Sequence, residues 1–203
     1  MFNDDDERRI AEAITQAEDK TSGEIVAVVA AESDSYLYAP IMWAAIIALL
    51  VPWPLIYLTG FSLPTIYLTQ LIVFFLALLI LFPKPVRLLL VPPALKRLRA
   101  HRQSVEQFLA QDLHTTKSRT SVLIFVSMAE RFAAVLPDTA IARKVDKQIW
   151  QGAVDALVAH MDKKQPAEGF IEAINRVGGE LAKHYPPGSG NPNDLPNHLI
   201  VLD

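Results

Sequence analysis

The chain has 203 residues, with 19 Lys and Arg against 22 Asp and Glu, and it contains no cysteine. The net charge of −3 argues against a dedicated nucleic-acid binder, and the lack of cysteine excludes disulfides, thiolate metal sites and a cysteine nucleophile. Hydrophobic residues make up 51% of the chain and charged residues only 20%, an imbalance that points to a membrane segment.

The first 38 residues predict one helix and one strand. Asn3 or Asp4 can cap a helix whose first turn is acidic, and a helical apolar stripe continues to Ala17. Thr21-Ser22-Gly23 stops this helix, and the run 24–31 (EIVAVVAA) is typical of a buried strand.

Two apolar runs follow, at 41–58 and 66–82, with no charged residue between Asp34 and Lys84. Each run is close to the roughly 20 residues that cross a bilayer, so together they predict a transmembrane helical hairpin. A buried hairpin of a soluble protein is one alternative, although neither run has the polar face of a soluble helix. Pro52 and Pro54 leave open a second alternative, a re-entrant hairpin that does not fully span.

The flanking charges predict the orientation. The loop between the two runs has no Lys or Arg, whereas the basic segment 84–102 has no acid, so positive residues would stay in the cytoplasm. The N-terminus shows no signal peptide. We therefore expect an inner-membrane protein with two spans and both termini cytoplasmic. The basic residues are also candidates for contact with anionic lipid headgroups; they are Lys84, Arg87, Lys96, Arg97, Arg99 and Arg102.

After the membrane segment the pattern returns to alternating helices and strands. We expect helices at 94–113, 138–163 and from Pro166 to before Pro186, with strands at 121–126, 131–136 and 198–202. Neither polar half can form a sheet alone, so the fold class is one α/β domain with the two-helix transmembrane hairpin inserted after its first strand. The predicted divisions are 1–38, 39–83, 84–102 and 103–203.

Several motifs resemble the TPM domain, more narrowly its bacterial membrane-protein branch. They are Ser22-Gly23-Glu24-Ile25, the stretch 122–131 (VLIFVSMAER), Tyr185-Pro186-Pro187 and Asn193-Asp194-Leu195-Pro196-Asn197. The resemblance implies an α/β sandwich with a central mixed sheet, and membrane association. For some relatives it implies weak acid phosphatase activity or divalent-cation binding, and for others a role in assembling membrane complexes. This chain departs from the common family plan, which has a signal peptide, an extracytoplasmic domain and a tail anchor.

A few residues are candidates for a site. Arg131 could contact an anion or a partner, and the candidate ligands for calcium or magnesium are Glu130, Asp138, Asn193 and Asp194. Each has a plainer interpretation: an ion pair at a turn for Glu130-Arg131, a helix cap for Asp138, and turn formation for Asn193 and Asp194.

No hydrolase motif or complete catalytic constellation is visible. The leading hypothesis is therefore a membrane-anchored, cytoplasm-facing module that binds or assembles other membrane proteins. The alternative is a divalent-cation-dependent phosphatase. Whether the chain is an enzyme stays open.

Overall fold

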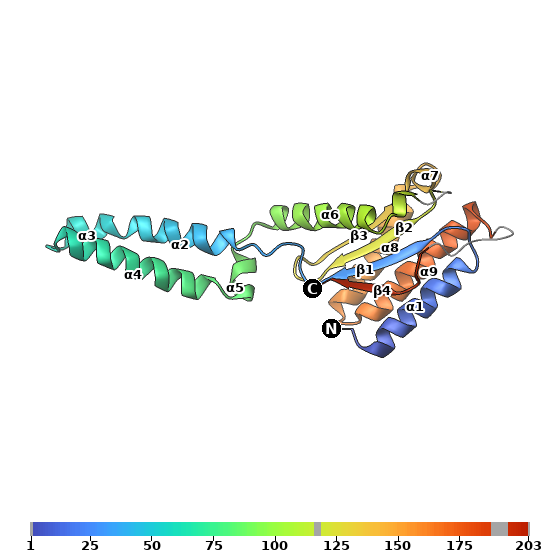
Figure 1. Ribbon diagram of the computed structural model, residues 1–203, viewed down its shortest axis with the longest axis horizontal. Coiled ribbons are helices and arrows are strands. Elements are labelled where there is room, and N and C mark those ends of the chain that lie inside the picture. Colours follow the sequence, from blue (N-terminus) through green and yellow to red (C-terminus); the bar gives the residue numbers. More distant parts are fainter. Residues whose placement is uncertain (1, 116–118, 188–194, 203) are drawn as a thin grey trace. The chain divides into compact units, whose positions relative to one another are not determined.

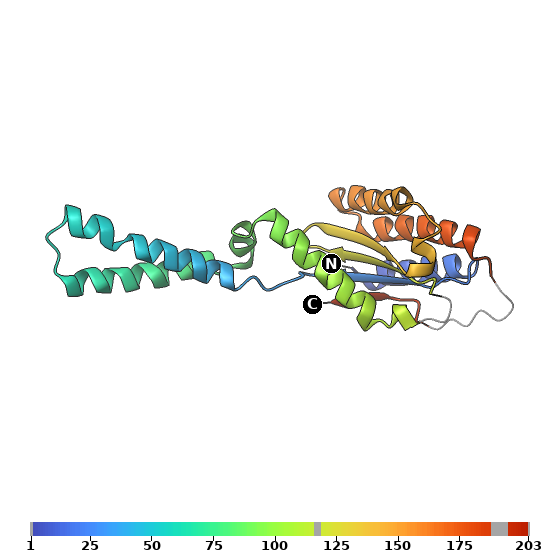
Figure 2. The same cartoon turned by 90° about the horizontal axis from the view of Figure 1, so that it is seen from above.

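The computed structural model describes residues 2–115, 119–187 and 195–202. In these residues four strands form one mixed sheet in the order β3-β2-β1-β4 (Figures 1 and 2). The strands are β1 (Ile25–Ala30), β2 (Val122–Ser127), β3 (Phe132–Pro137) and β4 (Leu199–Leu202). β1 pairs in parallel with β2 and β4, and β3 pairs antiparallel with β2. The predicted α/β class, mixed sheet and final edge strand are confirmed.

The middle of the sheet explains the continuous apolar runs in the sequence. Every residue of β1 and β2 is buried. Strands that are covered on both faces have no solvent side, so they do not alternate between apolar and polar residues. The edge strand β3 is only partly buried along most of its length.

Helices cover both faces of the sheet (Figures 1 and 2). On one face lie α1 (Asp4–Glu18), α8 (Lys147–Asp162) and α9 (Pro166–His184), which form the larger core around Ile14, Phe170 and Ile174. On the other face, α6 (Pro93–Ala110) packs Phe108 against a smaller core that contains Leu123 and Phe125. A single 3-10 turn, η1 (Leu113–Thr115), follows α6.

The contact between α1 and α9 depends on a glycine. A side-chain methyl group built on Gly178 would lie 2.7 Å from the Cβ of Ala17, closer than two carbons can approach. The two small residues therefore let the helices pack closely. At its other end α1 begins as predicted, because the side chain of Asn3 accepts a hydrogen bond from the N–H of Asp6 at 2.7 Å and completes a capping box.

The predicted single helix at 138–163 is wrong. The structure has a one-turn helix, α7 (Thr139–Ala142), and then α8, with a break between them. Asp146 causes the restart, because its carboxylate accepts from the N–H of Gln148 at 2.9 Å and caps α8. Ile141 and Val145 keep the helical spacing across the break, which is why the apolar pattern does not reveal it.

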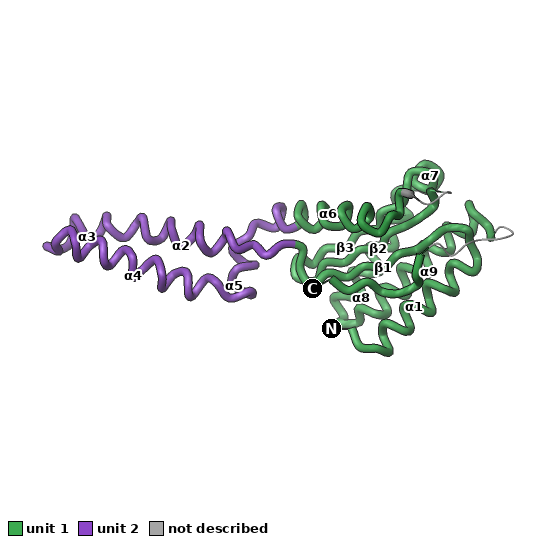
Figure 3. Tube along the Cα trace, viewed as in Figure 1, with its two compact units in different colours: residues 1–33, 97–203 green, residues 34–96 purple. Residues whose placement is uncertain are grey.

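The chain divides into two compact units, residues 1–33 with 97–203, and residues 34–96 (Figure 3). The second unit contains α2 (Tyr38–Leu50), α3 (Pro52–Leu58), α4 (Leu63–Leu81) and the short α5 (Lys84–Leu89), which the sequence did not predict. This division places residues 34–38 and 84–96 with the apolar helices, which differs from the predicted divisions.

In the second unit α4 runs back alongside α2 and α3 (Figures 1 and 2). Ala44 and Ala48 are buried between them, and small residues of this kind allow two helices to pack closely. The continuous helix 38–58 and α4 are, among the described residues, two helices long and apolar enough to cross a membrane. Only 11% and 6% of their most apolar stretches are buried.

Candidate functional site

A buried polar network lies at the carboxyl ends of β1 and β2. The hydroxyl of Ser127 donates to Oε2 of Glu130, and the hydroxyl of Ser33 donates to Oγ of Ser127 at 2.7 Å. The N–H of Ser33 donates to Oε1 of Glu130 at 3.0 Å. Ser127 is fully buried and Glu130 is 8% exposed, so both groups are largely shielded from solvent. The network therefore ties the segment after β1 to the turn after β2.

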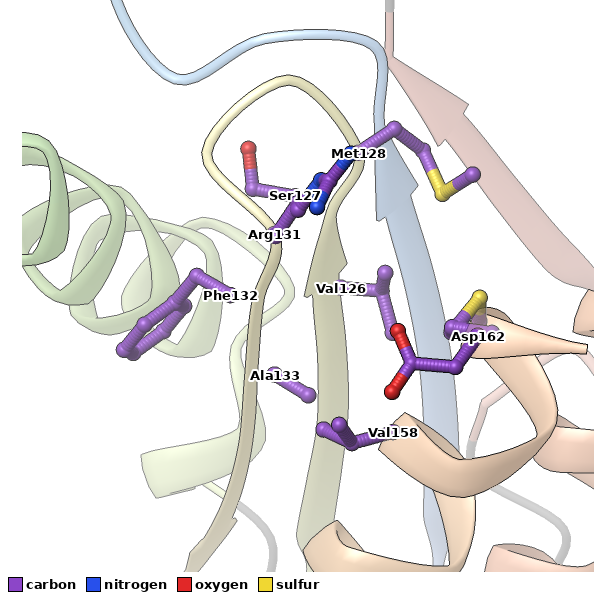
Figure 4. A pocket seen from close by; sticks show the side chains of 9 residues that line it. Val126, Ser127, Met128, Arg131, Phe132, Ala133, Val158 and Asp162 are labelled. Carbon is purple, nitrogen blue, oxygen red and sulfur yellow. The ribbon is translucent and has the colours of Figure 1, made fainter.

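The turn that Glu130 anchors places Arg131 beside a pocket of about 160 Å³ (Figure 4). Arg131 has a φ of 51°, a left-handed conformation that costs a non-glycine residue about 1–2 kcal/mol. Figure 4 shows Val126, Ala133 and Val158 around the apolar part of the pocket. The carboxylate of Asp162, from the end of α8, points toward the strands. The pocket therefore combines apolar walls with one cationic and one anionic residue.

Two more open cavities, of about 600 and 390 Å³, share lining residues with this pocket and with each other. Together the three form a continuous depression along β3, which we name the β3 groove. Its lining residues are Val126, Ser127, Met128 and Arg131 before β3, 132–137 of β3, Ala142 of α7, Lys147, Trp150, Gln151, Val154, Asp155, Val158, Ala159, Met161 and Asp162 of α8, and Arg97 and His101 of α6.

The two walls of the β3 groove differ in charge. The α6 wall carries Arg97 and His101, and the His101 ring lies edge-on to Phe132 with 6.5 Å between ring centroids. The α8 wall combines apolar side chains with Lys147, at the start of the helix, and with two carboxylates. One of them, Asp155, accepts a hydrogen bond from the side chain of Gln151 at 2.8 Å. The groove is therefore cationic on the α6 wall, whereas the α8 wall is apolar and acidic from Asp155 to Asp162 and cationic at Lys147.

Two of the four predicted metal ligands, Glu130 and Asp138, are not brought together. Glu130 and Asp138 lie at opposite ends of β3, about 20 Å apart at the usual rise of a strand. Asp138 is 4% exposed and caps α7 by accepting from the N–H of Thr139 at 2.5 Å, so the cap interpretation is confirmed. Asn193 and Asp194 lie outside the described residues. Within the described residues no group of three or more Asp, Glu or His side chains is placed to hold a metal ion.

The basic residues 84–102 divide between the two units. Lys84, Arg87 and Lys96 belong to the unit of residues 34–96, where the Lys96 ammonium donates to the carbonyl oxygen of Leu88 at 3.1 Å. The other three, Arg97, Arg99 and Arg102, follow one another along α6 in the α/β unit.

Sequence reasoning missed Glu18, a buried carboxyl at the end of α1. It is 9% exposed, and its Oε1 accepts from the N–H of Ile25 at 2.7 Å. Burial raises the pKa of Glu18 to about 7, and the nearby Glu24 carboxylate adds to the rise, while the hydrogen bonds from Ile25 and Asn197 oppose it. The sequence did contain a sign that Glu18 is buried, because Glu18 continues the spacing of Ile10 and Ile14 on the apolar face of α1.

Comparisons with known proteins give one informative likeness. No protein-family model matches the chain, and no curated protein matches it. The chain is similar to the NMR structure of BA42 protein from the psychrophilic bacterium Bizionia argentinensis. The TM-score is 0.63 with 17% sequence identity, and the match covers 99% of this chain and 95% of that chain. At this identity the likeness concerns the fold alone.

Proposed function

We propose that this chain is a membrane-anchored module that binds other membrane proteins, with helix 38–58 and α4 crossing the bilayer as a hairpin. The observation that carries the anchor is the exposure of large apolar side chains on both helices. Leu50, Leu58 and Leu79 are 61%, 81% and 73% exposed. Burying a leucine side chain stabilises by about 1.5–3 kcal/mol, so two such helices gain far more in hydrocarbon than in water.

The proposed topology places both termini and the α/β unit on the cytoplasmic side of the inner membrane. The basic residues that follow α4 favour this orientation. Helix α6 adds support for contact with anionic headgroups. Its Leu98, Val105 and Leu109 share one face and are 62%, 40% and 51% exposed, and the same helix carries Arg97 and Arg102.

The α/β unit is proposed to be a TPM-like sandwich interrupted by the hairpin. Three features support this assignment: the mixed sheet, the position of Ser22–Ile25 at the start of β1, and the turn with Glu130 and Arg131 after β2. The anchor residues 34–96 lie in the chain between β1 and β2, as an insertion requires.

Partner binding is assigned to the β3 groove. It is long and open, it has apolar walls, and it carries both positive and negative side chains. These are features of a surface that recognises a polypeptide. The phosphatase alternative stays a prediction, because the described residues supply no group of metal ligands and Asn193 and Asp194 lie outside them.

The anchor can be tested with single cysteines, since the chain has none of its own. A methyl group built on Gly60, between the two helices, meets no atom within 4 Å, so Gly60→Cys should fit without strain. In intact bacterial cells a membrane-impermeant maleimide should label this cysteine, whereas Lys163→Cys should be labelled only after lysis. Labelling of Lys163→Cys in intact cells would reverse the topology, and a Gly60→Cys that stays protected would support the re-entrant alternative.

Partner binding can be tested by placing a photo-crosslinking amino acid at Gln151 in the β3 groove. A matched control carries it at Glu12, an exposed position on α1. We expect reproducible adducts with membrane proteins from position 151 and none from position 12. The same adducts from both positions, or none from either, would count against the groove as a partner site.

A further inference from the structure

The outer edge of β3 carries backbone groups that no described strand uses. Among the described residues β3 pairs with β2 alone. The N–H of Asp138 donates to the carbonyl oxygen of Ser121 at 2.8 Å, so that pair is hydrogen-bonded. Opposite residues of two antiparallel strands alternate between hydrogen-bonded and non-hydrogen-bonded pairs. Every second residue of β3 therefore directs its backbone groups away from β2, and these residues are Ala133, Val135 and Pro137.

The composition of β3 leaves this edge able to pair. Edge strands are commonly blunted by charged residues or by proline, yet the strand (FAAVLP) has no charge, and its proline stands at the very end. Pro137 removes one outward N–H, while Ala133 and Val135 keep theirs. Ala133 and Ala134 are small, so another backbone can approach to the usual 4.7–4.9 Å between strands.

We propose that the β3 groove binds an extended segment of a partner protein as a fifth strand of the sheet, and that this segment alternates apolar and acidic side chains. A strand paired to β3 would send successive side chains to opposite faces of the sheet. One set would meet Val154 and Val158 on the α8 wall. The other set would meet Arg97 and His101 on the α6 wall.

The charges of the groove select the register of that segment. Beside Phe132 and Ala133, acidic side chains would be attracted by Arg97, and Asp155 and Asp162 would repel them from the α8 wall. Lys147 lies at the other end of α8, so this selection acts in the half of the groove that holds the two aspartates. A slip by one residue would exchange the two sets and bring like charges together. Backbone pairing therefore supplies affinity, and the two walls supply specificity.

The probe for this inference is the acetylated and amidated peptide Val-Glu-Val-Glu-Val-Glu-Val, titrated into the full chain in nanodiscs. Binding should be saturable, and hydrogen exchange at the amides of Ala133 and Val135 should slow at least about tenfold, since both become hydrogen-bonded. The amides of Ala134 and Leu136, which already face β2, should change little. A peptide with lysine in place of glutamate should bind more weakly.

Two variants test the pairing and the charge separately. Ala133→Pro removes an outward N–H without removing a bond to β2, so it should abolish binding while the thermal unfolding transition remains. If this variant does not fold, methylation of alternate amides in the peptide tests the same bonds. Arg97→Gln should weaken binding by up to about fivefold, the usual range for one exposed charge pair.

Three results would overturn the inference: no saturable binding, binding without protection of Ala133 and Val135, or protection that is present before peptide is added and is lost on dilution. The last would make a second copy of this chain the occupant. The inference rests on the proposed partner-binding function, but the two can fail separately. Adducts from position 151 without peptide pairing would retain a partner and reject the strand. Peptide pairing without membrane-protein adducts would retain the strand-binding edge and reject a membrane-protein partner.

Discussion

Replacing Glu18 with glutamine should remove most of the pH dependence of the stability of the α/β unit between about pH 5 and pH 8. The native carboxyl is buried beside Ile25 and has its pKa raised to about 7, against an ordinary value of 4.5. Between these two values the folded chain binds a proton at Glu18 that the unfolded chain does not. The free energy of unfolding must therefore fall as the pH rises through this window.

The size of the effect follows from the two pKa values. Each unit of difference corresponds to 1.36 kcal/mol, so the stability that Glu18 contributes below about pH 4.5 is reduced by about 3 kcal/mol above pH 7. Glutamine carries no charge, and its Oε1 can still accept from the N–H of Ile25. At about pH 8 the Glu18→Gln variant should be more stable than the wild type by up to this amount. Near pH 5 the two should be similar.

The assay is urea unfolding of the full chain in non-ionic detergent, followed by the fluorescence of Trp150. This residue is 6% exposed in the larger core, and Trp43 and Trp53 are replaced with phenylalanine so that only the α/β unit is observed. Glu12→Gln is the matched control, because Glu12 is an exposed acid on the same helix. The reasoning would be refuted if the free energy of unfolding still fell with rising pH in the Glu18→Gln variant, or if it did not fall in the wild type.

Three further predictions concern local packing and conformation, each measured by the same unfolding assay. Gly178→Ala should destabilise the fold by about 1–3 kcal/mol, because its methyl group would collide with Ala17. The control Gly179→Ala should stabilise it by up to about 1 kcal/mol, because a methyl group there meets no atom within 4 Å. Equal effects of the two substitutions would refute the close packing of α1 and α9. Asp146→Ala should cost about 1 kcal/mol by removing the cap of α8, and no loss would mean that the break before α8 has another cause. Arg131→Gly should be neutral or stabilising by up to about 1 kcal/mol, because glycine adopts the φ of 51° without strain, and the same variant should lower crosslinking in the β3 groove.

The parts of the fold that were readable from sequence are those with a local signal. The buried strands β1 and β2 appear as apolar runs, Pro166 marks the first turn of α9, and the length of the apolar runs identifies helix 38–58 and α4. The start of a new helix after Asp146 could not be predicted from the sequence. The apolar spacing is unbroken there, so Asp146 resembles any exposed residue within a helix. Its role depends on the hydrogen bond to Gln148, which the pattern does not contain.

The candidate site was predictable only in part, for the same reason. Glu130 and Arg131 were singled out at a turn between two strands, and the structure places them there. Their surroundings could not be foreseen. Ser33 is 97 residues from Glu130 in the chain and meets it only because β1 and β2 pair in parallel at one particular register. The β3 groove likewise combines residues from several elements that share no sequence motif.

The position of β1 in the sheet has a consequence for biosynthesis. Its two neighbours are β2 and β4, and β4 begins about 170 residues after β1 ends. At 5–20 residues per second a ribosome needs about 10–30 s to supply that last strand. In the proposed topology the hairpin reaches the bilayer first, while the apolar run Ile25–Ala30 waits without partners. In that topology the nascent chain would be tethered at the membrane before its sheet could close, and the tether would shorten the search for long-range strand pairing.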